Sequence, residues 1–358
     1  MPTNSSTSNS KRPNAFLLAL LVVCALRALE LFALPIESFT FRSWEALVVR
    51  RLYFALPGPF YPDRTVDMIE EGDLAPHTPL AVKKHVVFTT DSHGYRKRPA
   101  NDDRWDAVIV GDSFTAGATL TQDDTLSEML EKRVHERFYP LAPASIGYFL
   151  DAERFKNNQP KLVILELMET FIPSGVPADS APFAVATTWK QKLLQPLLKP
   201  FPRLAVLVDR LDKGIIYANA SAMLKRLLKK VPPAGNTPML FRGDPGVLPE
   251  QVDGIARGIE AARAVVERRG MRFLFLPIPD KETIYWDLRP GIPKPDGLAR
   301  LIARLKKDGL PVVDTLSAFE AARRRAPRDF LYHTDDSHWN PRGVALTADL
   351  VARELSLH

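Results

Sequence analysis

Apolar and polar positions alternate along the chain in two ways. Short, nearly continuous apolar runs, as expected for strands buried on both faces, lie at 106–111, 162–167, 272–277 and 311–314. Stretches with apolar residues at helical spacing lie at about 123–137, 250–269, 296–307 and from Pro341 to about 355. Strands and helices that alternate in sequence predict an α/β fold, in which helices cover both faces of a parallel sheet.

Two regions depart from this alternation. Residues 61–104 predict loops and short strands, of which 86–89 is the clearest, and 141–146 fits either a strand or a loop. Residues 171–250 form an insertion, in which many prolines bracket two helical segments at about 187–198 and 203–230. The insertion is either a lid over a site or a structural excursion, and the sequence leaves both open.

The N-terminal region has the pattern of a membrane anchor. A polar tail (1–13), expected to be disordered and cytoplasmic, leads through Lys11-Arg12 into a mostly apolar segment at 14–36. That segment is about long enough to cross a bilayer. We expect a single-pass transmembrane helix in the inner membrane, with the rest of the chain in the periplasm. A cleaved signal peptide and an internal hydrophobic helix are the alternatives, although no small-x-small cleavage site follows the apolar run.

The remaining domain boundaries follow from composition. Residues 37–85 mix aromatic residues with arginines, which predicts either a connector at the membrane interface or an amphipathic helix packed on the domain. Residues 86–356, interrupted by the insertion, would form the α/β domain. The formal net charge of +6 comes from scattered lysines and arginines, so we expect no nucleic-acid partner. Cys24 is the only cysteine, which excludes an intramolecular disulfide and a cysteine-based metal site.

The first candidate for chemistry follows the strand predicted at 106–111. Val108-Ile-Val runs into Gly111-Asp112-Ser113-Phe114, and a serine at the C-terminal end of a strand is well placed to act as a nucleophile. The Ser113 backbone N–H could donate to an oxyanion, and Asp112 could brace the loop. The alternative is that Ser113 only caps a helix.

The second candidate lies near the C-terminus, in Thr334-Asp-Asp-Ser-His-Trp339. His338 can take a proton from Ser113, and either Asp336 or Asp335 can orient the imidazole, because the spacing does not choose between them. A metal site formed by His333, Asp335 and His338 would lack a ligand from elsewhere in the chain. We expect no metal and no cofactor.

These stretches carry a family resemblance. Gly111-Asp112-Ser113-Phe114, with an aspartate shortly before His338, resembles the SGNH/GDSL hydrolase superfamily. Asp336-Ser-His-Trp339 is similar to the Asp-x-His-Trp motif of its alginate O-acetyltransferase branch. Pro279-Asp-Lys-Glu-Thr-Ile-Tyr285 resembles the Pro-x-Lys-x-x-x-Tyr pattern of that branch, and Glu166-Leu-Met-Glu169 its acidic strand end. The resemblance covers about 86–170 and 250–356.

The resemblance implies a flavodoxin-like α/β/α fold and an acyl-serine intermediate. It implies Ser113 as nucleophile, His338 as base and Asp336 as its orienter, with Asp335 under the Asp-x-x-His spacing. The Ser113 N–H and Gly147 would form the oxyanion hole. The superfamily's Gly-x-Asn-Asp motif is absent, since the chain has Leu167-Met-Glu-Thr170 there. Losing one oxyanion donor can cost about two to three orders of magnitude in rate.

Three functions remain open on this basis. The first is an O-acyltransferase, expected to be an acetyltransferase, that modifies an extracytoplasmic polysaccharide with an acyl donor supplied through a multi-pass membrane partner. The second is an esterase that hydrolyses such esters through the same acyl-enzyme. The third is a carbohydrate-binding assembly component with the same fold, which the missing asparagine favours and the Ser113/His338 pair opposes.

Overall fold

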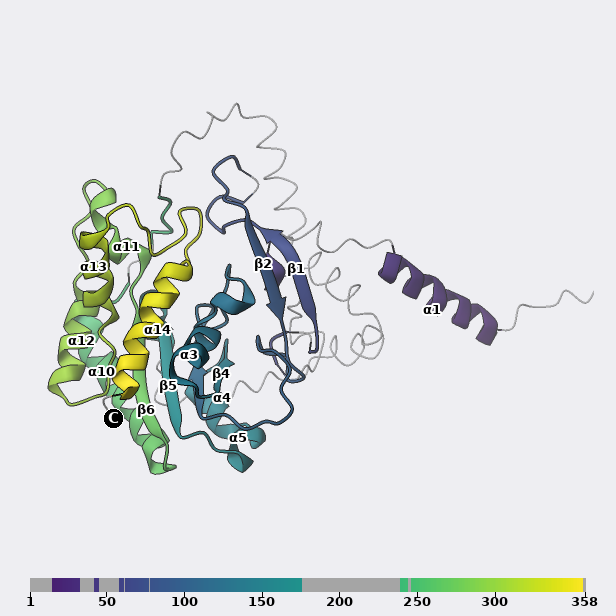
Figure 1. Ribbon diagram of the computed structural model, residues 1–358, viewed down its shortest axis with the longest axis horizontal. Helices are drawn as coiled ribbons and strands as arrows, with labels where there is room; N and C mark the ends of the chain where they lie inside the picture. Colours follow the sequence, from purple (N-terminus) through teal and green to yellow (C-terminus); the bar gives the residue numbers. More distant parts are fainter. Residues whose placement is uncertain are drawn as a thin grey trace, which may run out of the picture.

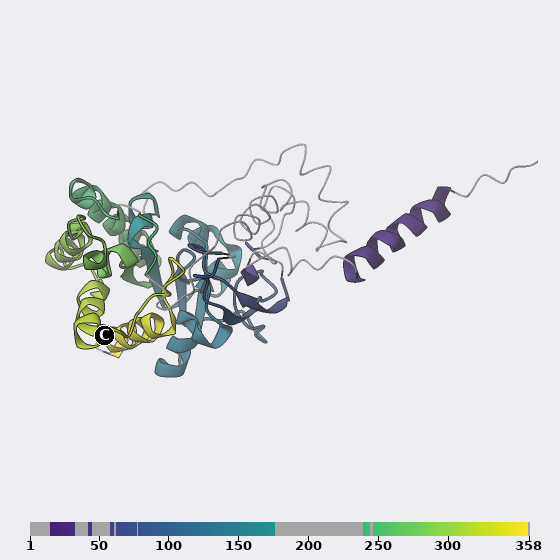
Figure 2. The same cartoon turned by 90° about the horizontal axis from the view of Figure 1, so that it is seen from above.

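The structure is a computed structural model, which describes residues 15–32, 42–44, 58–60, 62–76, 78–175, 239–243 and 246–356. Most of the predicted insertion at 171–250 lies outside the described residues, so its role as a lid or an excursion stays a prediction. The same holds for the polar tail at 1–13. Figures 1 and 2 show the α/β domain, with the C-terminus at its edge.

A four-stranded parallel sheet forms the centre of the domain. Its strands are β3 (Ala107–Val110), β4 (Phe138–Leu141), β5 (Leu162–Met168) and β6 (Arg272–Ile278), in the order β4-β3-β5-β6. Residues 107–110 of β3 pair with 138–141 of β4 and with 162–165 of β5. A parallel bridge from Phe275 to Val312 extends the sheet beyond β6. This is the flavodoxin-like order 2-1-3-4-5, and the predicted parallel α/β sheet is confirmed.

Helices cover both faces of this sheet. The helices α3 (Leu126–Val134) and α14 (Pro341–Ser356) pack against each other on one face, and α10 (Val252–Arg268) packs against β6 on the other (Figures 1 and 2). Helix α12 (Gly297–Lys307) lies beside α10, and α13 (Thr315–Arg325) contacts both α14 and β6. The strands β3, β4 and β5 are fully buried, which explains why they are apolar at every position rather than at alternate ones.

Short helices fill the remaining connections. They are α4 (Ile146–Asp151), α5 (Glu153–Asn157), α6 (Ile172–Gly175) and α11 (Lys281–Ile284), with single 3₁₀ turns at Gln122–Asp124, Glu169–Phe171, Pro249–Gln251 and Trp286–Leu288. The segment predicted at 141–146 as a strand or a loop is mostly a loop, since residues 142–145 connect β4 to α4. The apolar run at 311–314 contributes only the bridge at Val312.

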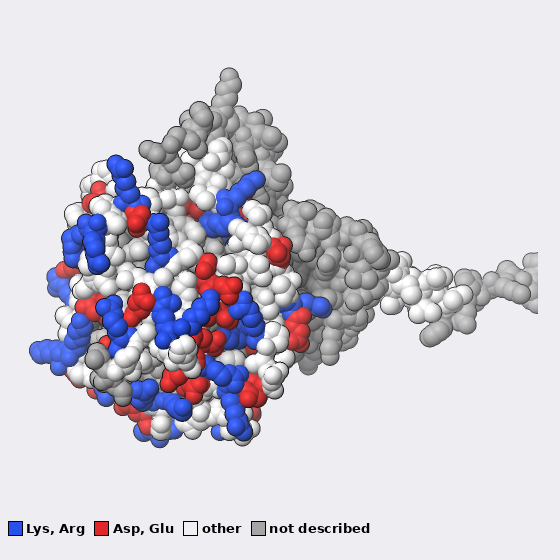
Figure 3. Space-filling model, viewed as in Figure 1, with Lys and Arg blue, Asp and Glu red and all other residues white. Residues whose placement is uncertain are grey.

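A β-hairpin that precedes β3 in the chain lies beside the sheet, and it spans the predicted boundary between the connector and the α/β domain. Strand β1 (Thr65–Glu70) pairs antiparallel with β2 (Lys84–Thr89), which includes the strand predicted at 86–89. Phe88 of β2 packs edge-on against Phe60, with ring centroids 5.0 Å apart. On the face shown in Figure 3, lysines and arginines are interspersed with acidic residues and form no continuous basic stripe.

The predicted transmembrane anchor at 14–36 is not supported. Among the described residues, no helix is both long and apolar enough to cross a membrane. Helix α1 (Ala15–Phe32) has 18 residues, and Arg27 and Glu30 interrupt its apolar sequence.

Candidate active site

The loop after β3 presents Ser113 at the C-terminal edge of the sheet. Gly111 begins the turn, and a Cβ atom there would lie 2.5 Å from the Glu166 Oε2 atom and 2.8 Å from the Glu166 carbonyl oxygen. Only glycine therefore fits this turn. Asp112 braces the loop, as predicted, because its carboxylate accepts the backbone N–H groups of Phe114 (2.8 Å) and Met168 (2.9 Å).

Glu166 supports the same loop from beneath. Its Oε2 atom accepts the backbone N–H of Thr115 at 3.0 Å and also the Thr115 hydroxyl. Burial, and secondly the neighbouring Asp112 carboxylate, raises the pKa of Glu166 well above its usual value. Burial also raises the pKa of Asp112, against the opposing effects of its two N–H donors and of His338. Two acidic groups thus lie directly behind the serine, and the charge of one disfavours ionisation of the other.

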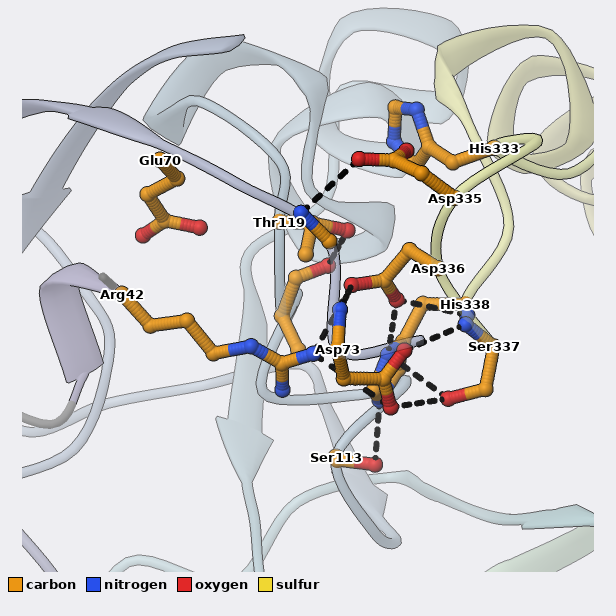
Figure 4. Close-up of polar contacts among 12 residues, drawn as sticks. Arg42, Glu70, Asp73, Ser113, Thr119, His333, Asp335, Asp336, Ser337 and His338 are labelled. Atoms are coloured by element: carbon orange, nitrogen blue, oxygen red, sulfur yellow. Dashed lines mark hydrogen bonds and ion pairs between the residues drawn. The ribbon is translucent and has the colours of Figure 1, made fainter. Parts of the chain in front are cut away.

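Ser113, His338 and Asp336 form a continuous hydrogen-bonded chain (Figure 4). The Ser113 hydroxyl lies 2.8 Å from Nε2 of His338, and Nδ1 of His338 lies 2.7 Å from Oδ1 of Asp336. The same carboxylate oxygen accepts the backbone N–H of His338 at 2.9 Å, which closes the turn around the imidazole. This geometry allows His338 to remove a proton from Ser113 while Asp336 fixes the ring.

Asp336 is fully buried, and its second carboxylate oxygen also accepts hydrogen bonds. Its Oδ2 atom accepts the Arg42 guanidinium at 2.8 Å and the Asp73 backbone N–H at 2.8 Å. Burial alone would raise the pKa of Asp336. The charges of His338 and Arg42 and the hydrogen bonds from His338 outweigh that effect, and the pKa lies well below its usual range. Asp336 is therefore a carboxylate at neutral pH.

Asp335 is the neighbour that the sequence could not separate from Asp336, and it faces the β1–β2 hairpin. Its Oδ2 atom accepts the backbone N–H groups of Gly72 (2.9 Å) and Val82 (2.7 Å), and Lys84 forms an ion pair with it at 2.9 Å. A Cβ atom on Gly72 would lie 2.1 Å from the Asp335 carbonyl oxygen, so these segments are in close contact. Asp335 ties the hairpin to the His338 loop, and Asp336 contacts the imidazole.

Two residues of the Pro-x-Lys-x-x-x-Tyr stretch hold the His338 loop from the sheet side. Lys281, at the start of α11, donates through Nζ to the carbonyl oxygens of His333 (2.6 Å), Thr334 (3.1 Å) and Asp336 (2.9 Å). The Tyr285 hydroxyl accepts the Leu331 backbone N–H at 2.8 Å. Burial lowers the pKa of Lys281 to about 8, and nearby carboxylates, Asp336 first, limit the decrease.

Aromatic packing fixes the imidazole against the serine loop. The Phe114 ring lies 4.9 Å from the His338 ring and 5.2 Å from the buried Trp339 ring, centroid to centroid. The residue after Ser113 therefore packs against both His338 and Trp339. Aromatic contacts of this kind contribute about 0.5–1.5 kcal/mol beyond the burial of their area.

The N-terminal connector contributes residues that the sequence did not reveal as part of the site. Arg42 lies 3.3 Å from the Asp73 carboxylate as well as 2.8 Å from Asp336. Ser43 anchors this segment, since its backbone N–H donates at 2.6 Å to Glu70 and its hydroxyl contacts the same carboxylate. Asp73 in turn accepts the Ser337 N–H (2.8 Å) and hydroxyl (2.6 Å). The described part of the predicted 37–85 connector thus packs on the domain and the site.

A cavity of about 270 Å³ opens at Ser113 and His338. Its other lining residues are apolar or aromatic on one side and charged on the other: Trp44, Pro59, Phe60, Phe88, Ala116, Ala118 and Pro143, with Arg42, Asp73 and Arg242. A cavity with an apolar wall and a few polar groups is typical of a small-molecule site.

The structure offers one candidate hydrogen-bond donor to an oxyanion. The Ser113 backbone N–H has no hydrogen-bond partner among the described residues, so it is available to an oxyanion. Gly147 lies in the first turn of α4, after the Ser145 cap, and the loop after β4 reaches the cavity through Pro143 instead. A role for Gly147 as second donor stays a prediction.

The residues that could bind a metal in the structure differ from those considered in the sequence. Asp73, Asp336 and His338 are the described residues whose ligand atoms cluster within 4.8 Å. The oxygens and nitrogens that would face an ion are already engaged with Arg42, Ser337 and Ser113. The His333 imidazole is not in this cluster, and burial lowers its pKa to about 4.

The chain was compared with curated proteins, solved structures and protein families. No curated protein matches the chain. A solved structure from Desulfitobacterium hafniense DCB-2, assigned to a lipolytic G-D-S-L family, is 10% identical, with a TM-score of 0.37, over 69% of this chain and 98% of its own. Another solved structure is 12% identical, with a TM-score of 0.33, over 71% of this chain and 97% of its own. With TM-scores this low, neither structure supports a conclusion about the fold or the function of this chain.

The family match is more specific. Residues 240–358 match the family described as "SGNH hydrolase-like domain, acetyltransferase AlgX". The matched region contains Lys281, Tyr285, Asp336 and His338, and Ser113 lies outside it. The resemblance to the AlgX branch of the SGNH hydrolase-like proteins is therefore confirmed over the C-terminal third of the chain.

Proposed function

We propose that this protein is a serine-dependent O-acetyltransferase that acts on a polysaccharide. The observation that carries the proposal is the hydrogen-bonded chain from Ser113 through His338 to Asp336 at the mouth of a cavity. The match of residues 240–358 to AlgX acetyltransferase domains supports acyl transfer as its chemistry. The catalytic roles of the three residues are part of the proposal.

The first half-reaction forms an acyl-serine. His338 Nε2 takes the proton from Ser113 as its oxygen attacks the carbonyl carbon of the donor ester. The Ser113 N–H donates to the oxyanion of the tetrahedral intermediate. When that intermediate collapses, the bond to the donor alcohol breaks, and His338 returns the proton to the leaving oxygen.

The second half-reaction repeats these steps with a sugar. The acceptor hydroxyl gives its proton to His338 and attacks the acyl carbon, and the Ser113 oxygen leaves with that proton. The ionised Asp336 stabilises the imidazolium that forms in each half. The aromatic wall of Trp44, Phe60 and Phe88 offers a surface on which a sugar ring can lie near the acyl group.

Partition of the acyl group tests the proposal. The full chain is incubated with an activated acetyl ester and oligosaccharides of different composition, and acetylated sugar and free acetate are both measured. We expect acetylated sugar to form faster than acetate with at least one acceptor, and neither product to form with Ser113→Ala. Acetate as the only product would make the protein an esterase. Turnover that survives in Ser113→Ala would contradict both activities.

A further inference from the structure

Arg42 contacts the carboxylate of the proposed triad. It comes from a segment 294 positions away in the chain from Asp336, and its side chain is buried between Asp336 and Asp73. Arg42 contacts Oδ2 of Asp336, whereas His338 contacts Oδ1 (Figure 4). The triad carboxylate therefore contacts a cation as well as the imidazole.

Two carboxylates lie near the imidazole. Asp336 contacts Nδ1 directly at 2.7 Å, and the ligand atoms of Asp73, Asp336 and His338 all lie within 4.8 Å of one another. Ser337 bridges Asp73 to the ring, since its hydroxyl lies 2.6 Å from Asp73 and 3.4 Å from Nδ1. A carboxylate within about 4–6 Å favours the charged imidazolium by about one to three pKa units.

Other titratable and charged groups also surround His338. They come from the serine loop, the hairpin, the His338 loop, α11 and the cavity wall: Asp112, Lys84, Asp335, His333, Lys281 and Arg242. Lys84 forms an ion pair with Asp335, and Lys281 donates to three backbone carbonyls. His333 is neutral, because burial lowers its pKa to about 4. Arg42 is the cation that contacts both Asp73 and Asp336.

We propose that Arg42 is a positioning residue that offsets the charge of Asp73 and so disfavours the imidazolium form of His338, which cannot act as a base. A base must be unprotonated before it can take the Ser113 proton. With Arg42 in place, its positive charge offsets that of the Asp73 carboxylate beside the imidazole. Without it, two carboxylates would favour the imidazolium. The inference rests on the proposed function for its catalytic consequence but not for its effect on the titration of His338.

The pKa of His338 is measured directly by NMR in the full chain, with His338→Gln to assign the imidazole signal. We expect Arg42→Met to raise the pKa by about one unit, a tenfold change in the protonation equilibrium. Arg42→Lys, which keeps the charge, should stay near wild type. The double variant Arg42→Met/Asp73→Asn should return toward wild type, because the carboxylate that Arg42 offset is removed together with it.

Ser43→Ala is the matched control for disturbance of the segment. It removes the hydroxyl contact with Glu70 and keeps the backbone N–H bond to the same carboxylate, which holds Arg42 beside Asp336, so the His338 pKa should not move. An unchanged or lowered pKa in Arg42→Met would overturn the proposal. If Arg42→Met does not fold, Asp73→Asn alone decides: it should lower the His338 pKa, and an unchanged or raised value would overturn the proposal.

Kinetics give a second readout that a purely structural role would not produce. In Arg42→Met, the acid limb of the pH profile of kcat/KM should move to higher pH by the same amount as the His338 pKa measured by NMR. At pH values above the displaced limb, kcat/KM should return to the wild-type value. A uniform loss at every pH, without a displaced limb, would contradict the proposal. If the wild type shows no acyl transfer at all, the proposed function fails, and the NMR titration still decides the role of Arg42.

Discussion

Asp335 and Asp336 are adjacent and fully buried, and their contacts assign them different tasks. Asp336 orients His338, and Asp335 accepts hydrogen bonds from the hairpin and from Lys84. We predict that Asp336→Asn lowers kcat by about 10⁴-fold, because an amide can stabilise the wrong tautomer of the imidazole. Asp335→Asn should lower the melting temperature instead and leave kcat within about tenfold of wild type, as expected for a loss of ion pairing outside the reacting atoms.

Steady-state rates and thermal unfolding of both variants separate these roles. Rates must be compared at a temperature at which both variants are folded, so that an unfolded fraction does not lower the apparent kcat. The assignment would be reversed if Asp335→Asn lost the larger share of kcat while Asp336→Asn remained active.

His333 makes a pH-dependent contribution to stability. Burial lowers its folded-state pKa from 6.5 to about 4, so the unfolded chain binds a proton at this residue over that range and the folded chain does not. The stability that the neutral imidazole contributes above pH 6.5 is therefore lost as the pH falls toward 4. The loss amounts to about 3 kcal/mol.

Chemical denaturation of wild type and His333→Gln at pH 7 and pH 4 measures this contribution. The free energy of unfolding of wild type should fall by about 3 kcal/mol more than that of the variant between the two pH values. The comparison cancels the effects of buried acids such as Glu166, whose raised pKa acts in the opposite direction. An equal fall in both proteins would exclude a buried neutral His333.

At the scale of elements, α11 connects the sheet to the His338 loop through one side chain. Lys281 directs its ammonium group at three carbonyl oxygens of residues 333–336. We predict that Lys281→Met lowers the free energy of unfolding by about 3 kcal/mol, because buried acceptors lose a charged donor. It should also lower kcat by at least about tenfold, since a displacement of the catalytic base by an ångström is costly.

Lys156→Met is the matched control, because Lys156 is an exposed lysine whose ion pair with Glu153 lies on the surface. It should leave kcat unchanged and alter stability by less than about 1 kcal/mol. Lys281→Met with wild-type kcat would show that the loop holds its shape without this contact.

Sequence periodicity located the long elements of the domain and missed the short ones. The strands β3, β5 and β6 and the helices α10, α12 and α14 lie within a few residues of their predicted bounds, since each buries a continuous run or stripe of apolar residues. Helix α11 has only four residues, too few to show a helical period. Helix α13 is as long as α12 but was not predicted either, because its cap residue Asp314 ends an apolar run. The Asp314 carboxylate accepts the Ser317 N–H at 3.0 Å.

Some residues of the candidate site could likewise be predicted from the sequence, and others could not. Ser113, His338 and Asp336 could be predicted because each lies in one of two short, recognisable stretches, residues 111–114 and 336–339. Arg42 and Asp73 could not, because the partner of each is more than 260 positions away and neither lies in a local pattern. Lys281 had one signal, its place in the Pro-x-Lys-x-x-x-Tyr stretch, which gave a resemblance but no physical role.

At the scale of the whole molecule, the site is assembled from both ends of the chain. Residues 42–44 contact the hairpin and the His338 loop, so the α/β domain alone does not contain every group around Asp336. We predict that a chain beginning at residue 45 has a kcat/KM at pH 7 at least about tenfold below that of a chain beginning at residue 37. Both should retain the far-ultraviolet circular dichroism of the parallel sheet. Equal activity of the two chains would show that residues 42–44 are dispensable.

The proposed mechanism requires an acyl group on Ser113, and intact mass spectrometry detects that group. The full chain is mixed with an activated acetyl ester and quenched in acid after successive intervals, with Ser113→Ala and His338→Ala run in parallel. We predict one acetyl adduct in wild type, mapped to Ser113, which disappears on addition of a suitable oligosaccharide. The adduct should be absent from Ser113→Ala and form far more slowly in His338→Ala. A folded wild-type protein that never acquires the adduct, or that carries it equally in Ser113→Ala, would contradict the account.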